Sequence, residues 1–263
     1  MNFFLAEPEM SWEEILSEED FRLYRENISL LEEQVIERFT HSYEAPDILR
    51  GIRSVPRHLF VHREYRYLAY TDNAFPTCCG LTTSAPSVIA EMIFHSGIQQ
   101  AGSLLEIGTG TGYEAAVLSE MGVHVFTIEI DKTVGRAANR ILSSLGYKVD
   151  NTIRNPERRE EASRAYSRIR RLFPHRGRIA LYIGNGSGGL PDDAPYDAII
   201  VAAAIRRLED IGPLRAQLRK GRRLLYLYGD RNIQTLYILE RQNNRFKTAV
   251  LEGVSFSFLP LIT

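Results

Sequence analysis

Cysteine and long apolar runs are both scarce in this sequence. Its 263 residues include only two cysteines, Cys78 and Cys79. Because they are adjacent, they cannot cross-link distant segments, and we expect a protein of the reducing cytoplasm. No stretch approaches the roughly 18 apolar residues that cross a bilayer. The first twenty residues lack the basic start and apolar run of a signal peptide, so we expect neither a leader nor a membrane span.

Metal-ligand spacing and a strong net charge are also missing. Apart from His58 and His62, the six histidines show no HxxxH-type spacing, and they lack the joint company of carboxylates and cysteines, so we expect no metal site. The net charge of −1 gives no overall attraction to nucleic acid or to a membrane. Charge is nevertheless uneven, with eleven acidic and three basic residues in 1–40 and nine arginines with three glutamates in 154–178. These stretches are either solvated helical faces or, for the arginines, a surface for an acidic partner.

The second half of the sequence alternates between strand and helix patterns. Candidate strands span 103–107, 123–129, 178–183, 196–201, 222–228 and 234–240, with a last one within 250–259, and candidate helices span 112–121, 131–145 and 207–219. Alternation at this length predicts an α/β fold, a doubly wound sheet with helices on both faces.

Helical patterns precede the sheet. Apolar periodicity predicts a helix over 11–39, with Ser11 and Glu14 as a capping box. Asp47 is expected to cap a second short helix, and a third is expected from Pro86 through Phe94. We therefore divide the chain into an acidic helical extension, 1–40, and an α/β domain, 41–263, with a basic insertion at about 150–178.

A glycine-rich turn follows the first strand of the alternating region, in the sequence LLEIGTGTGYEA (104–115). A strand, a glycine turn and a helix place backbone N–H groups beside a ligand. The dinucleotide fingerprint GxGxxG does not fit, because Tyr113 occupies the position of its last glycine, and no P-loop Gly-Lys-Ser/Thr follows. The pattern ExGxGxG instead resembles motif I of class I methyltransferases, whose ligand is S-adenosylmethionine.

The motif resemblance implies a set of cofactor-binding residues. Glu106 meets the ammonium side of the ligand, directly or through water, and the carboxylate of Glu129 accepts the ribose hydroxyls. Glu129 alone does not distinguish a methyltransferase from a dinucleotide-binding protein, because dinucleotide folds also place an acid about 20 residues after the glycine motif. The turn that follows the third strand suits the adenine edge. The remaining cofactor candidates are Gly108, Thr109, Gly110, Gly112, Tyr113, Gly184 and Asn185.

Five further stretches narrow the resemblance to one family. They read VPRHLFV (55–61), AYTDNAFP (69–76), GLTTSAP (80–86), APYDAIIVAAA (194–204) and SFLPLI (257–262). From about Leu30 to the C-terminus the chain is similar to protein-L-isoaspartate O-methyltransferases. The resemblance implies a Rossmann-like class I methyltransferase fold. It also implies methylation of the α-carboxylate of L-isoaspartyl residues in peptides or proteins, followed by spontaneous closure to a succinimide.

The resemblance also indicates the acceptor site. Its active-site serine corresponds to Ser84, and Thr82 and Thr83 correspond to positions that line the cofactor and acceptor pocket. A carboxylate, with an ordinary pKa near 4, attacks without a general base, but it needs hydrogen bonds to hold it. Alternatively, these three hydroxyls only cap the helix that follows Pro86.

Several features depart from the family pattern and leave alternatives open. Asn185 replaces the usual aspartate, the basic insertion is long, and Ile205-Arg206 replaces a proline. The acceptor is therefore either an isoaspartyl residue or an aspartyl side chain of a dedicated peptide precursor. A nucleic-acid methyltransferase that holds phosphates with the arginines is a second possibility, although no N/D-P-P-Y/F motif is present. A non-catalytic binding protein is the third. We expect Arg57 to be a structural ion-pair partner.

Overall fold

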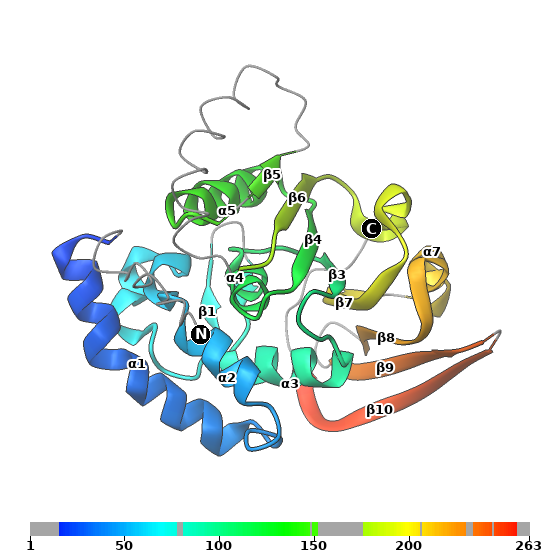
Figure 1. Ribbon diagram of the computed structural model, residues 1–263, viewed down its shortest axis with the longest axis horizontal. Helices are drawn as coiled ribbons and strands as arrows, with labels where there is room; N and C mark the ends of the chain where they lie inside the picture. Colours follow the sequence, from blue (N-terminus) through cyan, green and yellow to red (C-terminus); the bar gives the residue numbers. More distant parts are fainter. Residues whose placement is uncertain are drawn as a thin grey trace, which may run out of the picture.

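The fold is built on a mixed eight-stranded sheet, seen in a computed structural model that describes residues 16–77, 81–147, 149–151, 176–205, 207–229, 234–243 and 245–256. The strand order is β10-β9-β8-β7-β3-β4-β6-β5 (Figure 1). The strands are β3 (Ser103–Ile107), β4 (His124–Glu129), β5 (Val149–Asn151), β6 (Ile179–Ile183), β7 (Tyr196–Ile205), β8 (Leu218–Gly229), β9 (Gln234–Gln242) and β10 (Arg245–Phe256).

Most of this sheet is parallel. Strands β5 to β8 run in the same direction as β3 and β4, whereas β9 pairs antiparallel with both β8 and β10. A separate small ribbon pairs β1 (Phe75–Pro76) with β2 (Thr82–Thr83). The predicted strands are confirmed, except that the last one, expected within 250–259, begins earlier, at Arg245, and residues 257–259 lie outside the described residues. Strand β5 is one that the sequence patterns did not reveal.

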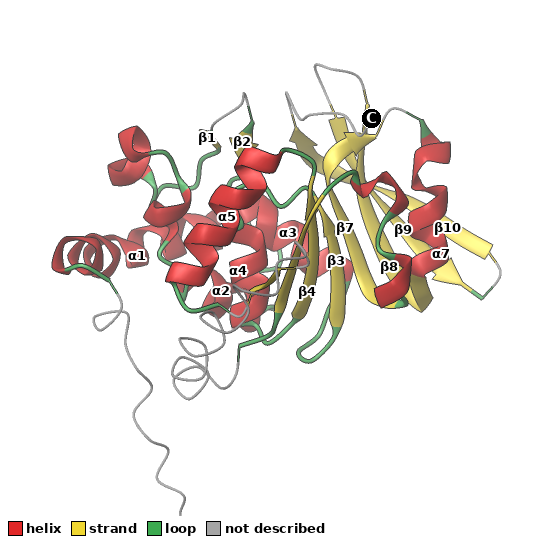
Figure 2. Cartoon of the chain, turned by 90° about the horizontal axis from the view of Figure 1, so that it is seen from above, coloured by secondary structure: helices red, strands yellow, loops and turns green. Residues whose placement is uncertain are grey.

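Helices cover the two faces of the sheet unequally. They are α1 (Glu18–Arg38), α2 (Pro46–Arg53), α3 (Pro86–Ser96), α4 (Tyr113–Glu120), α5 (Lys132–Ser144) and α7 (Gly212–Gln217). Figure 2 shows α1, α2, α4 and α5 on one side of the sheet and α7 on the other. Consecutive residues of β3 divide between the two cores, because Leu104 packs with the α1–α5 cluster and Leu105 with the α7 cluster. The predicted doubly wound α/β architecture is confirmed.

Three predicted helices differ from the observed ones at their ends. Helix α1 begins at Glu18 instead of residue 11, because the Ser17 hydroxyl caps it by accepting from the Asp20 N–H at 3.2 Å; Ser11 lies outside the described residues. Asp47 does not cap α2, because Pro46 occupies the start of that helix and Ala45 is the N-cap. The helix predicted over 207–219 is split into a 3₁₀ turn, Leu208–Ile211, and the short α7.

Helix α1 is not a detached appendage. Its residues Ile28, Leu31 and Val35 are buried in the same hydrophobic cluster as the helices of the sheet domain. The division of the chain at residue 40 stays a prediction.

The chain direction creates a crevice beside β3. The chain passes from β3 to β4 on one side and only later returns to β7 on the other side. At such a switch point the loops after neighbouring strands diverge, and ligands of α/β folds bind outside the carboxyl ends of the strands there. The glycine turn follows β3 at this point.

Candidate active site

The glycine turn leaves β3 with a backbone that favours glycine. Gly108, Gly110 and Gly112 have φ values of 100°, 54° and 88°. L-residues with a side chain rarely adopt such values. A Cβ atom at Gly110 would meet no atom within 4 Å, whereas one at Gly112 would lie 3.0 Å from Leu142. Gly110 therefore lies on the open side of the turn, whereas the lack of a side chain at Gly112 allows α4 to pack closely against α5.

Glu129 ends β4 beside this turn. Its Oε2 accepts the Gly110 N–H at 2.9 Å, and its Oε1 accepts the Asp131 N–H at 2.9 Å. The side chain is thus held in place by two backbone donors, and each oxygen keeps a further lone pair for a ligand. A carboxylate with this support is suited to accept two neighbouring hydroxyl groups.

Two further carboxyl groups are buried next to the turn. Glu106 is 1% exposed and accepts the hydroxyl of Thr127, which also contacts the hydroxyl of Thr109. Burial, together with the neighbouring charge of Glu114, raises the pKa of Glu106 well above its ordinary value. Burial raises the pKa of Glu114 to about 8, and its Oε1 is buried without a hydrogen-bond partner. Both groups become easier to ionise when a cation lies beside them.

The predicted acceptor hydroxyls lie on and just after β2. Thr83 is buried, and its hydroxyl accepts the Phe75 N–H at 3.2 Å across the small ribbon. Among the described residues the structure gives Ser84 no side-chain hydrogen bond. The hydroxyls do not cap α3, whose N-cap is Ala85 without a side-chain bond; the Ser87 N–H is satisfied by Asp72 at 2.8 Å instead. The capping alternative is therefore wrong.

One cavity joins these groups. Predicted residues that line it are Thr82, Thr83, Ser84, Glu106, Gly108, Thr109, Gly110, Tyr113, Glu129 and Asn185. Gly112 and Gly184 do not line it; the Gly184 N–H bonds to the Glu129 carbonyl at 2.9 Å and fixes the start of the next turn. Lining residues that the sequence analysis did not select include Glu114, Asp131, Ile89, Ile130 and Ala202.

Asn185 stands at the predicted adenine position. Its Oδ1 accepts the Ser187 N–H at 2.9 Å and so caps the 3₁₀ turn Gly186–Gly188. A carbonyl oxygen has a second lone pair, so this cap does not prevent it from accepting a ligand amine.

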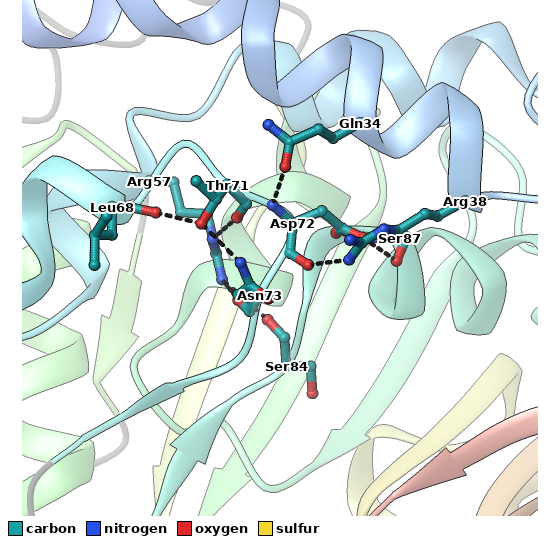
Figure 3. A network of polar contacts seen from close by, with 9 residues as sticks. All are labelled: Gln34, Arg38, Arg57, Leu68, Thr71, Asp72, Asn73, Ser84 and Ser87. Atoms are coloured by element: carbon teal, nitrogen blue, oxygen red, sulfur yellow. Dashed lines mark hydrogen bonds and ion pairs between the residues drawn. The ribbon is translucent and has the colours of Figure 1, made fainter.

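Arg57 has a structural role, as predicted, but through hydrogen bonds and not through the predicted ion pair. It is fully buried, and among the described residues it forms four hydrogen bonds to backbone carbonyls and no ion pair; Figure 3 draws the bonds to Thr71, Asn73 and Ser84. The acceptors and distances are Ala69 (2.7 Å), Thr71 (2.9 Å), Asn73 (2.6 Å) and Ser84 (3.3 Å). The guanidinium also lies over the rings of Phe75 and Tyr113, at 5.2 and 5.5 Å from their centroids. Arg57 therefore ties the Ser84 backbone to the 69–73 loop.

The same loop is anchored to α1. Asp72 accepts from the Ser87 hydroxyl at 2.6 Å and from Arg38 at 3.3 Å, and its N–H bonds to Gln34 Oε1 at 3.0 Å (Figure 3). Sequence patterns could not reveal this network, because its members come from three separate stretches of the chain.

Most of the arginine-rich stretch lies outside the described residues. Arg176 is described, and its Nε forms a buried ion pair with Glu120 Oε1 at 2.8 Å, while its guanidinium lies over Tyr147. This arginine therefore stabilises the buried interior and is not available to a partner at the surface. In the described part of the chain no helix is long and apolar enough to span a membrane.

Comparison with known proteins identifies relatives for nearly the whole chain. Residues 26–262 match the family model described as protein-L-isoaspartate(D-aspartate) O-methyltransferase. A protein-L-isoaspartate O-methyltransferase 1 from Syntrophobacter fumaroxidans is 34% identical over 86% of this chain and 90% of its own. A protein-L-isoaspartate O-methyltransferase from Chlorobaculum tepidum is 33% identical over 88% and 92%.

Solved structures show the same fold at lower identity. A crystal structure of a putative protein-L-isoaspartate O-methyltransferase from Plasmodium falciparum, in complex with S-adenosyl-L-homocysteine, matches with a TM-score of 0.63 and 18% identity, over 89% of this chain and 97% of that chain. A second structure, named protein-L-isoaspartate O-methyltransferase, matches with a TM-score of 0.64 and 20% identity. That match covers 87% of this chain but only 65% of the other.

Proposed function

Because the chain belongs to the protein-L-isoaspartate(D-aspartate) O-methyltransferase family and is therefore a methyltransferase that uses S-adenosylmethionine, we propose that it methylates the α-carboxylate of L-isoaspartyl residues in peptides or proteins. The backbone nitrogen then attacks the methyl ester and expels methanol to form a succinimide, which water reopens in part to normal aspartate. The observation that best supports this proposal is that the buried acids and the Thr82–Ser84 hydroxyls line a single cavity.

The residues of the cavity fit S-adenosylmethionine. When bound, it supplies an electrophilic methyl group on a positively charged sulfur. Glu106 and Glu114 are two buried carboxyl groups with raised pKa values, and no described residue bonds to one oxygen of Glu114, so a cationic ligand would stabilise the ionised form of both groups. We assign Glu106 to the ammonium side and Glu129 to the ribose. The turn Gly108–Gly110 then faces the methionine end, and Asn185 faces the adenine.

The acceptor end needs orientation more than proton transfer. An aspartyl-type carboxylate is ionised at neutral pH and carries its own nucleophilic oxygen. The chain's task is to hold that oxygen in line with the methyl carbon and to keep water out. In this proposal the Ser84 hydroxyl donates to the acceptor carboxylate, with help from Thr82 and Thr83. Arg57 is a positioning residue, because it holds the Ser84 backbone and does not line the cavity.

The setting and partners follow from the same proposal. We propose action in the cytoplasm, because adjacent Cys78 and Cys79 offer no cross-link between distant segments. The partners are peptides or proteins that contain isoaspartyl residues.

Product analysis of an isoaspartyl peptide tests this function. The peptide is incubated with the protein and S-adenosylmethionine, and its products are separated by chromatography. We expect the isoaspartyl peptide to decline while the succinimide and the normal aspartyl peptide appear. An unchanged peptide, under conditions in which the protein binds its cofactor, would contradict the proposed acceptor. Methylation of RNA or DNA in the same assay would favour the nucleic-acid alternative.

A further inference from the structure

Three possible metal ligands lie close together outside the cavity at the glycine turn. Glu91 and His95 lie one helical turn apart on α3, and His41 lies in the loop after α1. The nitrogen and oxygen atoms that these three side chains offer all lie within 4.8 Å of one another. The cluster does not line the cavity described above, so the methyltransferase chemistry does not account for it.

Each of the three side chains presents a buried atom to which no described residue gives a hydrogen bond. These atoms are Nδ1 of His41, Oε2 of Glu91 and Nε2 of His95. Glu91 Oε2 and His95 Nε2 lie 3.3 Å apart, close enough to form an ion pair when His95 is protonated. Buried polar atoms are nearly always satisfied, because leaving one unpaired costs about 1–3 kcal/mol. With both imidazoles neutral and these nitrogens unprotonated, the three atoms offer lone pairs that one cation can accept.

Neighbouring contacts hold these side chains in a ligating arrangement. Oε1 of Glu91 accepts the backbone N–H of Thr40 at 2.8 Å and the Thr40 hydroxyl at 2.6 Å, which leaves Oε2 for another partner. The His41 ring stacks on Phe94 with centroids 4.1 Å apart and lies edge-on to His95 at 5.2 Å. Support of this kind orients the ligands in metal sites of proteins.

We propose that His41, Glu91 and His95 bind a divalent metal ion of the zinc class. Two imidazoles and one carboxylate are a donor set that zinc accepts, with bonds of about 2.0–2.2 Å that place tetrahedral donors about 3.4 Å apart. The 3.3 Å between Glu91 and His95 matches this spacing. A contraction of up to about 1.4 Å brings the widest pair of the cluster, within 4.8 Å, to this spacing. The fourth ligand is either water or the exposed Glu44, whose Oε1 lies 3.6 Å from His41 Nδ1.

The electrostatic surroundings allow a cation. Arg223 is the nearby positive group, and it donates to the His95 carbonyl at 3.2 Å. Its side chain is 42% exposed and is paired with Glu240 at 3.6 Å, so solvent and that partner screen its charge. The carboxylates of Glu91 and Glu44 face the cluster itself.

A metal ion here would have a structural consequence. It would tie the loop after α1 to the last turn of α3, across 50 residues of chain between His41 and Glu91. Because the ion binds only the folded chain, zinc at 100 times its dissociation constant raises the ratio of folded to unfolded molecules about 100-fold.

Metal titration of the untagged, chelator-treated full chain tests this site. We expect one Zn²⁺ per chain by calorimetry, a higher unfolding temperature with Zn²⁺, and the visible absorption of tetrahedral Co²⁺ when cobalt replaces it. Mg²⁺, which prefers oxygen ligands, should have no such effect. These readouts do not depend on methyl transfer, so they stay valid whatever the acceptor is.

Conservative variants locate the site. Glu91→Gln keeps the acceptor for Thr40 but loses the charged Oε2, and His95→Gln removes one imidazole. We expect each to weaken Zn²⁺ binding at least tenfold. His62→Gln is the matched control, because His62 is half-exposed and lies outside the cluster. No saturable Zn²⁺ binding to the wild-type chain, or equal binding by the wild type and both cluster variants, would overturn the proposal.

Discussion

Replacing Arg57 by lysine tests the hydrogen-bond network that supports Ser84. The guanidinium serves four carbonyls from two nitrogens: NH1 donates to Ala69 and Thr71, and NH2 donates to Asn73 and Ser84. A lysine ammonium is a single point donor on a different stem and cannot span both pairs. Two buried carbonyls then lose their donors, at about 1–3 kcal/mol each. We expect the Arg57→Lys variant to lose about 3 kcal/mol of unfolding free energy.

Urea unfolding followed by circular dichroism measures this loss. The matched control is Arg53→Lys, the same chemical change at a side chain that is 58% exposed and pairs with Glu32 at 3.4 Å. Exposed ion pairs contribute about 0–1 kcal/mol, so this control should stay close to the wild type. If Arg57→Lys lies within about 0.5 kcal/mol of Arg53→Lys, the carbonyl network does not stabilise the loop as argued here.

Three other substitutions test the cavity. Glu129→Ala removes the ribose acceptor and should weaken S-adenosylmethionine binding at least about tenfold in calorimetry; unchanged affinity would remove this assignment. Ser84→Ala should reduce turnover by roughly 10–100-fold, the loss of one hydrogen bond to a charged group, while cofactor affinity stays within about twofold. An equal loss of both would make Ser84 a cofactor residue only. Glu114 has an ordinary pKa of 4.5 and a folded-state pKa of about 8, so between these values the unfolded chain releases a proton that the folded chain keeps. Without cofactor, the unfolding free energy should therefore fall as pH rises across this window, by up to about 1.4 kcal/mol per pH unit. Glu114→Gln should flatten this dependence, and parallel pH profiles of variant and wild type would contradict the buried-acid argument.

The sequence was most informative where short segments determine the structure. The parallel strands β3, β4 and β6 are buried on both faces, so they appear as short apolar runs. The glycine turn and the acid that ends the next strand are likewise local patterns, and both line the cavity. The helix that begins at Pro86 was also predictable, because a glycine, Gly97, stands where it ends; in the structure this glycine has the left-handed φ of 67° typical of a helix C-cap.

Contacts between distant segments were not predictable in this way. Arg57 follows a proline in a family-like motif, but its four acceptors lie 12 to 27 residues downstream. Strand β7 runs past its predicted end through a register shift between Val201 and Ala204, which places Ala202 at the cavity. Glu114 follows the motif directly, and only its burial distinguishes it from an ordinary helix residue. His41 approaches Glu91 and His95 only because α1 and α3 pack together.

The most direct test of the central claim is transfer of a labelled methyl group from S-adenosylmethionine to two matched peptides. One peptide contains L-isoaspartate and the other contains normal aspartate at the same position, and the base-labile label on each is counted. The account predicts label on the isoaspartyl peptide and little on the aspartyl peptide. Label on neither peptide, while the protein still binds the cofactor, would contradict it.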